Sequence, residues 1–350
     1  MLSRVKLFDM DEAEVQEGLA AGAPAYLLVN PIEYHGPHLS LLNDSLVSQG
    51  IARDMHTHLS QRASLPRPWP LLVTRDLDVG CEPAPGPGSE PRSFGTVKAR
   101  ILIACRELVR LGARRVVFVT FHGSPLHAFA IEAGVRWLSE RGVQAFSPMN
   151  LLLAELLSPE AARYEDAYSC ILDQELRRSM LADVGADFHG GFFETSVALH
   201  YAPSSVHADY TKVLPCPPFA ARPLAVRLRK ALSRVGLGAL GRELEVVSLS
   251  LSWFGLRPFP GYTGRPALAR AEAGEAFARH LMALFVPAAE RIFSGTERPG
   301  APPFAWLPLA TLWGKLGARV PASALPGPLP LSDPSSDQPS APGELRAPAA

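Results

Sequence analysis

Five side chains that can bind a metal ion or transfer a proton lie within twelve residues of one another: Glu33, Tyr34, His35, His38 and Asp44. They follow the apolar run AYLLV, which is typical of a buried strand. Residues two apart in an extended chain point the same way, so Glu33 and His35 can face one site while Tyr34 faces away. Carboxylate and imidazole groups together form a ligand set that zinc or manganese accepts.

Asp44 comes just before the helical pattern SLVSQGIARDM. The free N–H groups and the dipole of a first helical turn favour a carboxylate, so Asp44 can be held there as a ligand. A plainer explanation is that Asp44 caps a helix and His35 forms a hydrogen bond in a turn. This stretch alone leaves both explanations open, since short motifs also arise by chance.

Two later segments carry similar groups. His122 directly follows the apolar run RRVVFVT, at the carboxyl end of an expected strand, and open α/β sheets bind ligands beyond that end. In the segment DFHGGFFETS, glycines and phenylalanines separate His189 from Glu194. Glycine allows close backbone approach, and phenylalanine excludes water from a site. A single buried histidine is more often structural than a ligand, but the repeated pattern favours a metal site.

Apolar runs rich in β-branched residues alternate with amphipathic stretches of helical length. This alternation predicts an α/β fold with three layers, in which a mostly parallel central sheet lies between helices. The expected strands are residues 25–30, 71–74, 115–120 and 143–147. The expected helices are residues 45–62, 97–111, 125–141, 150–157, 194–201 and 266–293.

Composition also predicts where the domain ends. Residues 81–93 (CEPAPGPGSEPRS) are too rich in Pro and Gly for a helix or strand, which indicates a long loop that can border a cleft. We expect one α/β metal-hydrolase domain over residues 1–300. Residues 301–320 carry aromatic side chains and are predicted to form an appendage, and the Pro-, Ser- and Ala-rich residues 321–350 are predicted to be a disordered tail.

The overall composition excludes several classes of protein. Of the 350 residues, 47% are hydrophobic and 34 basic residues balance 34 acidic ones, which is typical of a globular protein and gives no net attraction to nucleic acid or anionic membranes. The four cysteines form no C-x-x-C pair, and no signal peptide or membrane span is apparent. We therefore expect a cytoplasmic protein whose partner is a small molecule, not nucleic acid or a membrane.

Five segments in a fixed order carry recognisable motifs. They are residues 33–40 (EYHGPHLS) with Asp44 beyond them, 93–96 (SFGT), 120–125 (TFHGSP), 189–196 (HGGFFETS) and 261–274 (GYTGRPALARAEAG). Together they resemble the motifs of the creatininase family of creatinine amidohydrolases, although the third matches only in part. The resemblance covers most of the expected domain and implies a creatininase-like fold.

The resemblance also implies a ligand set. By position, Glu33, His35, Asp44 and His122 correspond to metal ligands of the family, and Asp44 corresponds to the bridge between two divalent ions. A carboxylate that bridges two cations lowers the pKa of a shared water. Zinc, manganese and iron all accept such ligands.

One of the family's metal-ligand positions carries a different residue in this chain. Creatininase has a glutamate ligand two residues after the histidine of the third motif, where this chain has Ser124. We expect Glu194 to replace that glutamate as a metal ligand. His189 resembles the family's catalytic histidine, which passes a proton to the departing nitrogen. The resemblance further implies a homo-oligomer, since relatives are often hexamers.

These expectations describe a metal-dependent amidohydrolase of the creatininase type. It would cleave a non-peptide C–N bond, in a small amide or lactam, by attack of metal-bound hydroxide. Ser124 and Phe188, which both depart from the family's pattern, leave a non-catalytic creatininase-like scaffold or binding protein as an alternative. A third alternative is a peptidase that trims a modified precursor peptide, as some members of this family do.

Overall fold

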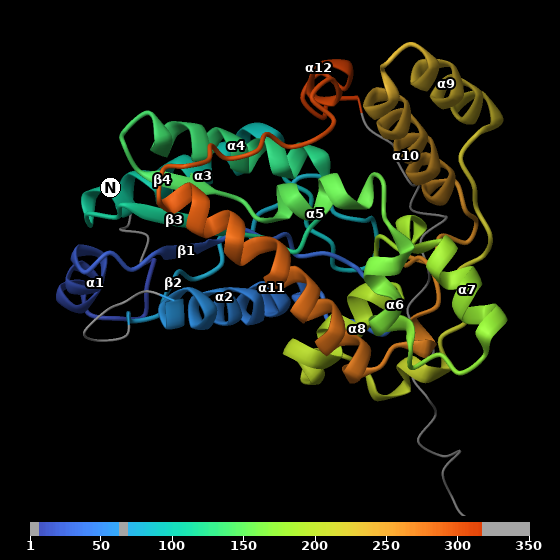
Figure 1. The fold of residues 1–350 in the computed structure, drawn as a ribbon, viewed down its shortest axis with the longest axis horizontal. Coiled ribbons are helices and arrows are strands. Elements are labelled where there is room, and N and C mark those ends of the chain that lie inside the picture. The colour runs from blue at the N-terminus through green and yellow to red at the C-terminus, as the bar shows by residue number, and fades with distance from the viewer. Residues whose placement is uncertain (1–6, 63–68, 317–350) are drawn as a thin grey trace, which may run out of the picture.

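The computed structural model describes residues 7–62 and 69–316 (Figure 1). The predicted disordered tail, residues 321–350, lies outside these ranges, so that prediction is not addressed by the structure. Within the described ranges, no helix combines the length and apolar character that a membrane crossing requires.

Four parallel strands form the central sheet, in the order β2-β1-β3-β4. The strands are β1 (Ala25–Leu28), β2 (Leu72–Val73), β3 (Arg115–Val119) and β4 (Gln144–Phe146). Each lies within a range predicted from the sequence. Because β1 pairs with β3 up to Leu28 and Val119, the loops that leave these two strands start side by side.

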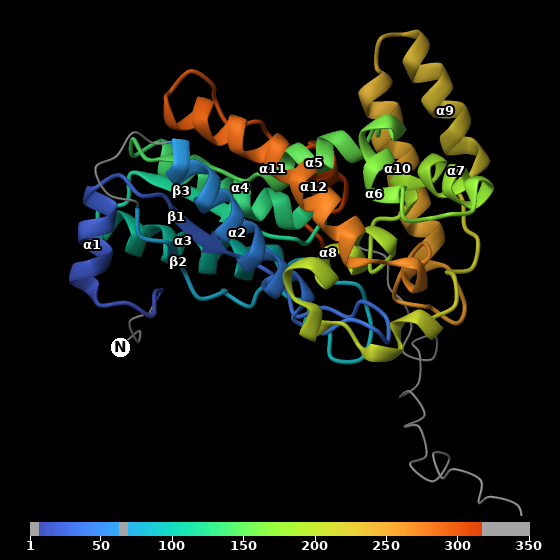
Figure 2. The same ribbon diagram turned by 60° about the horizontal axis from the view of Figure 1, so that its bottom comes forward.

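Helices cover both faces of the sheet, which confirms the predicted three-layer α/β fold (Figures 1 and 2). Along β1, Tyr26 and Leu28 pack into one core with side chains of α2 (Asn43–Arg62), α8 (Phe192–Tyr201) and α11 (Ala271–Phe293). Ala25 and Leu27 alternate with them and pack into a second core. That core is formed with α1 (Glu12–Ala20), α3 (Phe94–Arg110) and α4 (Pro125–Ser139).

The other helices gather beyond the carboxyl ends of the strands. They are α5 (Met149–Leu156), α6 (Glu165–Tyr168), α7 (Gln174–Ala182), α9 (Pro223–Arg234), α10 (Gly238–Phe254) and α12 (Leu307–Ala310). Helices α9 and α10 lie side by side at one end of the molecule (Figure 1). The division into a domain of residues 1–300 and an appendage of residues 301–320 stays a prediction.

Asn30 joins the segments that carry the site. Its Oδ1 accepts hydrogen bonds from the main-chain N–H of Phe121 at 2.9 Å and from Oγ of Ser48 in α2 at 3.0 Å. Its Nδ2 donates to Oδ2 of Asp76 at 2.5 Å. Asn30 is buried, so removal of its amide leaves the main-chain N–H of Phe121 and the hydroxyl of Ser48 without this partner in the interior. This one amide therefore fixes the ends of β1 and β3 relative to α2.

Replacing Asn30 with Ala is expected to lower the free energy of unfolding by about 3 kcal/mol, because buried partners lose their hydrogen bonds. Urea denaturation would measure the loss. The control is Gln16→Ala, which removes an exposed hydrogen bond between Nε2 of Gln16 and Oε1 of Glu12 and is expected to change stability by less than about 0.5 kcal/mol. Equal effects of the two substitutions would contradict the role of Asn30.

Candidate metal centre

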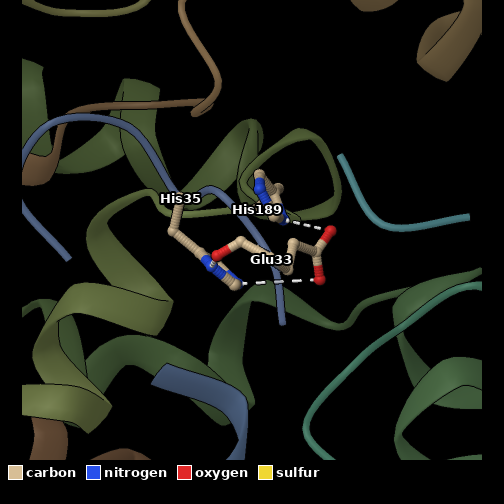
Figure 3. A group of neighbouring side chains, drawn as sticks. All are labelled: Glu33, His35 and His189. Carbon is tan, nitrogen blue, oxygen red and sulfur yellow. Dashed lines mark hydrogen bonds and ion pairs between the residues drawn. The ribbon is translucent and has the colours of Figure 1, made fainter. Parts of the chain in front are cut away.

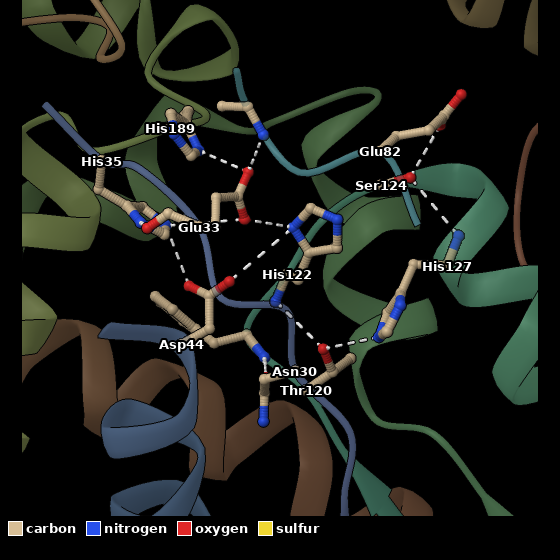
Figure 4. A network of polar contacts seen from close by, with 12 residues as sticks. Asn30, Glu33, His35, Asp44, Glu82, Thr120, His122, Ser124, His127 and His189 are labelled. Atoms are coloured by element: carbon tan, nitrogen blue, oxygen red, sulfur yellow. Dashed lines mark hydrogen bonds and ion pairs between the residues drawn. The ribbon is translucent and has the colours of Figure 1, made fainter. Parts of the chain in front are cut away.

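All six side chains predicted for the site meet at one place, beyond the carboxyl ends of β1 and β3. Figure 4 labels all of them except Glu194. They are Glu33 and His35 in the loop after β1, Asp44 in the first turn of α2, His122 just after β3, and His189 and Glu194 around the start of α8. All six are buried. Parallel strands place their outgoing loops at one edge, which explains why segments distant in sequence converge here.

Two groups of three side chains each bring their potential metal-binding atoms within 4.8 Å of one another. In the first, Nδ1 of His122 lies 2.7 Å from Oε2 of Glu33 and 3.8 Å from Oδ2 of Asp44. In the second, Nε2 of His35 and Nδ1 of His189 each lie 3.9 Å from a carboxylate oxygen of Glu33 (Figure 3). Glu33 belongs to both groups, so they form one cluster.

Main-chain carbonyl groups orient all three imidazole rings of the cluster. The contacts are His35 Nδ1 to Glu33 O at 3.0 Å, His122 Nε2 to Cys81 O at 2.8 Å and His189 Nε2 to Tyr34 O at 2.9 Å. A carbonyl oxygen can only accept, so the ring nitrogen at each contact must donate. In the neutral ring the opposite nitrogen then carries a lone pair, and that nitrogen faces the carboxylates. This is how proteins orient histidines that bind metals.

The carboxylates complete a donor set that suits a cation. Oε2 of Glu33 and both oxygens of Asp44 are buried and receive no hydrogen bond from the described residues. Nε2 of His35 lies only 3.0 Å from Oδ1 of Asp44, but the two do not form a hydrogen bond of regular geometry. Buried carboxylate oxygens without partners are costly, and a bound cation removes that cost. The residues present therefore fit a divalent metal ion.

The pKa values of the cluster show its attraction for positive charge. Burial would lower the pKa of His35, but the neighbouring carboxylates, Asp44 above all, outweigh it and raise the value to about 10. For His122, burial would again lower the pKa, but the carboxylates, Glu33 above all, outweigh it and raise the value to about 9. Burial would raise the pKa of Glu33, but the surrounding imidazoles hold it well below its usual range. The field that favours protons on these rings also favours metal cations.

Glu194 and His189 lie at the edge of the cluster. Oε2 of Glu194 accepts the main-chain N–H of Gly190 at 2.5 Å and lies 3.8 Å from Nε2 of His35, but Glu194 belongs to neither group of three. Burial raises its pKa to about 8. The ring of His189 stacks on that of His35 with centroids 4.3 Å apart, and burial lowers the pKa of His189 to about 3. His189 is therefore neutral near pH 7.

Ser124 has a structural role where the family's glutamate would stand. Its hydroxyl donates to Oε2 of Glu82 at 2.9 Å, and its Oγ accepts the main-chain N–H of His127, which caps α4. Glu82 has a φ of +53°, in the left-handed region that non-glycine residues seldom adopt. Ser124 thus ties the loop of residues 81–93 to the first turn of α4.

Two other histidines hold the backbone around the cluster. His38 was among the polar groups singled out in the sequence, but its Nε2 contacts the carbonyl oxygen of Gly190 at 2.9 Å, and burial lowers its pKa to about 4. His127, which the sequence analysis did not single out, contacts the carbonyl oxygen of Val29 through Nε2 at 3.0 Å. No motif marked His127, so only the fold could identify its role.

The cluster opens into a cavity of about 1730 Å³. The cavity is lined by residues of the 81–93 loop, by α5, by the cluster-facing side of α8, by α10 and by residues 304–316. The loop of residues 81–93 was predicted to border a cleft, and it does so. The size exceeds the roughly 300–1,000 Å³ that is usual for sites that bind small molecules.

Comparisons with known proteins agree with this geometry. A search of the curated proteins finds no match. Among solved structures, a type II creatininase mutant shares 20% identity at a TM-score of 0.51, covering 81% of this chain and 97% of that one. A creatinine amidohydrolase (creatininase) shares 19% identity at 0.50, with 81% and 96% covered, and a mutant creatininase in complex with creatine shares 20% at 0.50, with 81% and 97% covered.

At these identities the structural likeness establishes the fold. The sequence profile for Creatininase (creatinine amidohydrolase) matches residues 9–288, which is well over half of the chain and contains all six side chains of the cluster. The chain therefore belongs to the creatininase family.

Proposed function

We propose that this protein is a metal-dependent amidohydrolase that cleaves a C–N bond other than a peptide bond, in an amide or lactam of a small molecule. The observation that carries the proposal is the buried cluster itself. Imidazole nitrogens, each set by a carbonyl contact on the opposite side of the ring, face three carboxylate oxygens of Glu33 and Asp44 that accept no hydrogen bond of regular geometry from the described residues. Membership of the creatininase family supports the same class of reaction.

We assign the cluster to two divalent ions, zinc, manganese or iron. Glu33, Asp44 and His122 would hold one of them, and His35 with Asp44 and Glu194 the other. When bound, such ions make a coordinated water nucleophilic at neutral pH and polarise a carbonyl group.

His189 is the residue we assign to proton transfer. Its Nε2 is engaged with the carbonyl of Tyr34, so Nδ1 is the atom that can take up a proton and pass it to the departing nitrogen. The ring of Trp253 lies 5.4 Å from that of His189, centroid to centroid, and Phe188 packs edge-on against Trp253 at 5.5 Å. These aromatic rings keep water away from the imidazole, so its proton goes to the substrate.

The same evidence supports a cytoplasmic homo-oligomer that acts on a small molecule. All four cysteines are free thiols, as expected in a reducing compartment. Membership of the creatininase family supports the homo-oligomer.

Titration of chelator-treated protein with Zn²⁺ or Mn²⁺ tests the proposal. In the metal-free protein at pH 7 both His35 (pKa about 10) and His122 (pKa about 9) carry a proton that a ligand must give up. Binding of two ions is therefore expected to release two protons from these rings, and affinity is expected to rise with pH up to about 9–10. Glu194, which is assigned to the second ion and has a pKa of about 8, is expected to release a third proton.

Calorimetry in buffers of different ionisation enthalpy counts these protons. Protein that binds no divalent ion, and whose thermal stability is the same with and without EDTA, would contradict the proposed function.

A further inference from the structure

The cavity beyond the metal cluster has mainly apolar walls. Two helices contribute apolar walls to this cavity. The wall residues are Leu152, Leu153 and Leu156 of α5, and Val247, Leu251 and Phe254 of α10. The residues of α10 are spaced four, three and seven apart, which places them on one side of that helix, and Leu156 of α5 lies one turn from Leu152 and Leu153. An apolar surface of this kind is continuous with the candidate catalytic centre, since both line the same cavity.

A third wall comes from the end of the described chain. Glu243 of α10 holds it in place, because its carboxylate accepts the main-chain N–H of Phe304 at 2.9 Å and the indole N–H of Trp306 at 2.8 Å. From there the chain returns across the cavity, where the ring of Trp313 packs on that of Phe94 at 4.7 Å. Leu312 and Trp313 line the cavity although they are 54% and 45% exposed.

Charge is scarce on these walls. Beyond the six cluster residues, the charged side chains that the described residues contribute to the lining are Glu82, Arg92 and Lys315, and all three are exposed. Arg92 is paired with Glu90 at 2.5 Å, and Glu82 accepts the hydroxyl of Ser124. A charged group between α5 and α10 would have no partner there, so the walls favour an uncharged occupant.

The volume of the cavity gives a second constraint on the substrate. A small polar heterocycle bound at the cluster would fill a minor part of a cavity of about 1730 Å³ and leave the leucine-rich walls exposed to water. An apolar group attached to the reacting amide would cover them, with a gain that grows with its length.

We propose that the substrate is an amide or lactam that carries an extended, uncharged apolar group, which lies between α5, α10 and residues 304–316 while its carbonyl carbon reaches the metal cluster. This inference rests on the proposed hydrolase function and names its substrate class. In the reaction one water is consumed. Its oxygen bonds to the carbonyl carbon, the C–N bond breaks, and a proton passes to the nitrogen, which leaves as an amine and a carboxylic acid remains.

A series of primary carboxamides from butanamide to decanamide tests this inference in two ways. Release of ammonia by metal-loaded protein gives kcat/KM, and Trp fluorescence of chelator-treated protein gives affinity for the same amides without turnover. Both are expected to rise about fourfold for each added methylene group, because each such group is removed from water. A comparison of N-acetyl-Leu-Leu-amide with N-acetyl-Gly-Gly-amide tests whether apolar peptide side chains can occupy the cavity as well as an alkyl chain does.

Substitutions on the cavity walls locate the effect. Leu251→Arg on α10 and Leu312→Arg in residues 304–316 are expected to weaken decanamide binding about tenfold or more, and to lower kcat/KM for decanamide by a larger factor than kcat/KM for butanamide. Both side chains are partly exposed, so the fold tolerates the change. The matched control is Leu224→Arg on α9, where a 67% exposed leucine does not line the cavity, and no change is expected.

The two measurements separate this inference from the function on which it rests. Turnover of amides with no dependence on chain length, in both the alkyl and the peptide series, overturns the inference and leaves the hydrolase intact. Binding that strengthens with chain length without hydrolysis of any amide supports the apolar site and overturns the hydrolase. A preference confined to the Leu-Leu peptide supports the inference and assigns the apolar group to peptide side chains.

Discussion

Asp44→Asn is expected to abolish metal binding and hydrolysis while leaving the metal-free protein about as stable as the parent. Asp44 is buried in the first turn of α2, and neither of its oxygens receives a hydrogen bond from the described residues. Burial raises its pKa despite the neighbouring His35, which means that the fold disfavours the charged form. Asn has the same shape without the charge, so the metal-free fold loses the cost of a buried carboxylate but also the ion pair with His35 at 3.0 Å, and these two effects oppose each other.

The activity of the same variant should fall by at least about 1,000-fold, because the residue assigned to both ions no longer supplies a negative charge. Metal content per chain, measured after dialysis against Zn²⁺ or Mn²⁺, is expected to drop from two ions to one or none. Thermal unfolding in EDTA provides the second measurement. The control is Asp54→Asn in the same helix, where Oδ2 of Asp54 accepts the hydroxyl of Tyr201 at 2.7 Å, far from the cluster.

Two results would contradict this account of Asp44. A variant that keeps two ions would remove Asp44 from the ligand set. A variant that unfolds in EDTA well below the parent protein would show that the carboxylate has a structural role, as the capping explanation of the sequence requires. The prediction therefore decides between the two explanations that the sequence of this segment left open.

The sheet could be predicted from the sequence because its signal is local. The runs that form β1 and β3 are short and apolar, β3 is rich in valine, and their position between helical patterns implies a parallel sheet. The hairpin of α9 and α10 was not predicted. Helix α10 contains Ser and Val at many positions, and these lower its intrinsic helix propensity. It forms because it packs on α9 and on residues 304–306, contacts that no local pattern reveals.

The site could be predicted in composition but not in detail. The motifs brought out the six side chains that meet at the cluster, and their roles followed from the resemblance to the creatininase family. What the sequence could not show is the orientation of each imidazole, because the acceptors are main-chain carbonyls of Glu33, Tyr34 and Cys81. The cavity was equally hidden, since its walls come from three segments far apart in the chain.

His189 either transfers protons or binds a metal ion, and a substitution separates these two roles. If His189 transfers protons and does not bind metal, His189→Gln should lower kcat by about 100- to 10,000-fold and leave the metal content at two ions. If His189 is a ligand, as its place in a group of three with Glu33 and His35 allows, both quantities should fall together. The neutral ring keeps Nε2 on the carbonyl of Tyr34, and the side-chain amide of Gln can make the same contact, so the fold should survive.

Metal content and single-turnover kinetics on the same preparation give the answer, with His58→Gln, an exposed histidine in α2, as the control that should change neither. An inactive His189→Gln variant that keeps two metal ions supports the proton-transfer role. Such a variant should also regain turnover on activated esters more than on amides, because an alcohol leaves with less need of a proton than an amine does. Full activity in His189→Gln would contradict the assignment, and would leave protonation of the departing nitrogen to Glu194, whose pKa of about 8 keeps it protonated near pH 7.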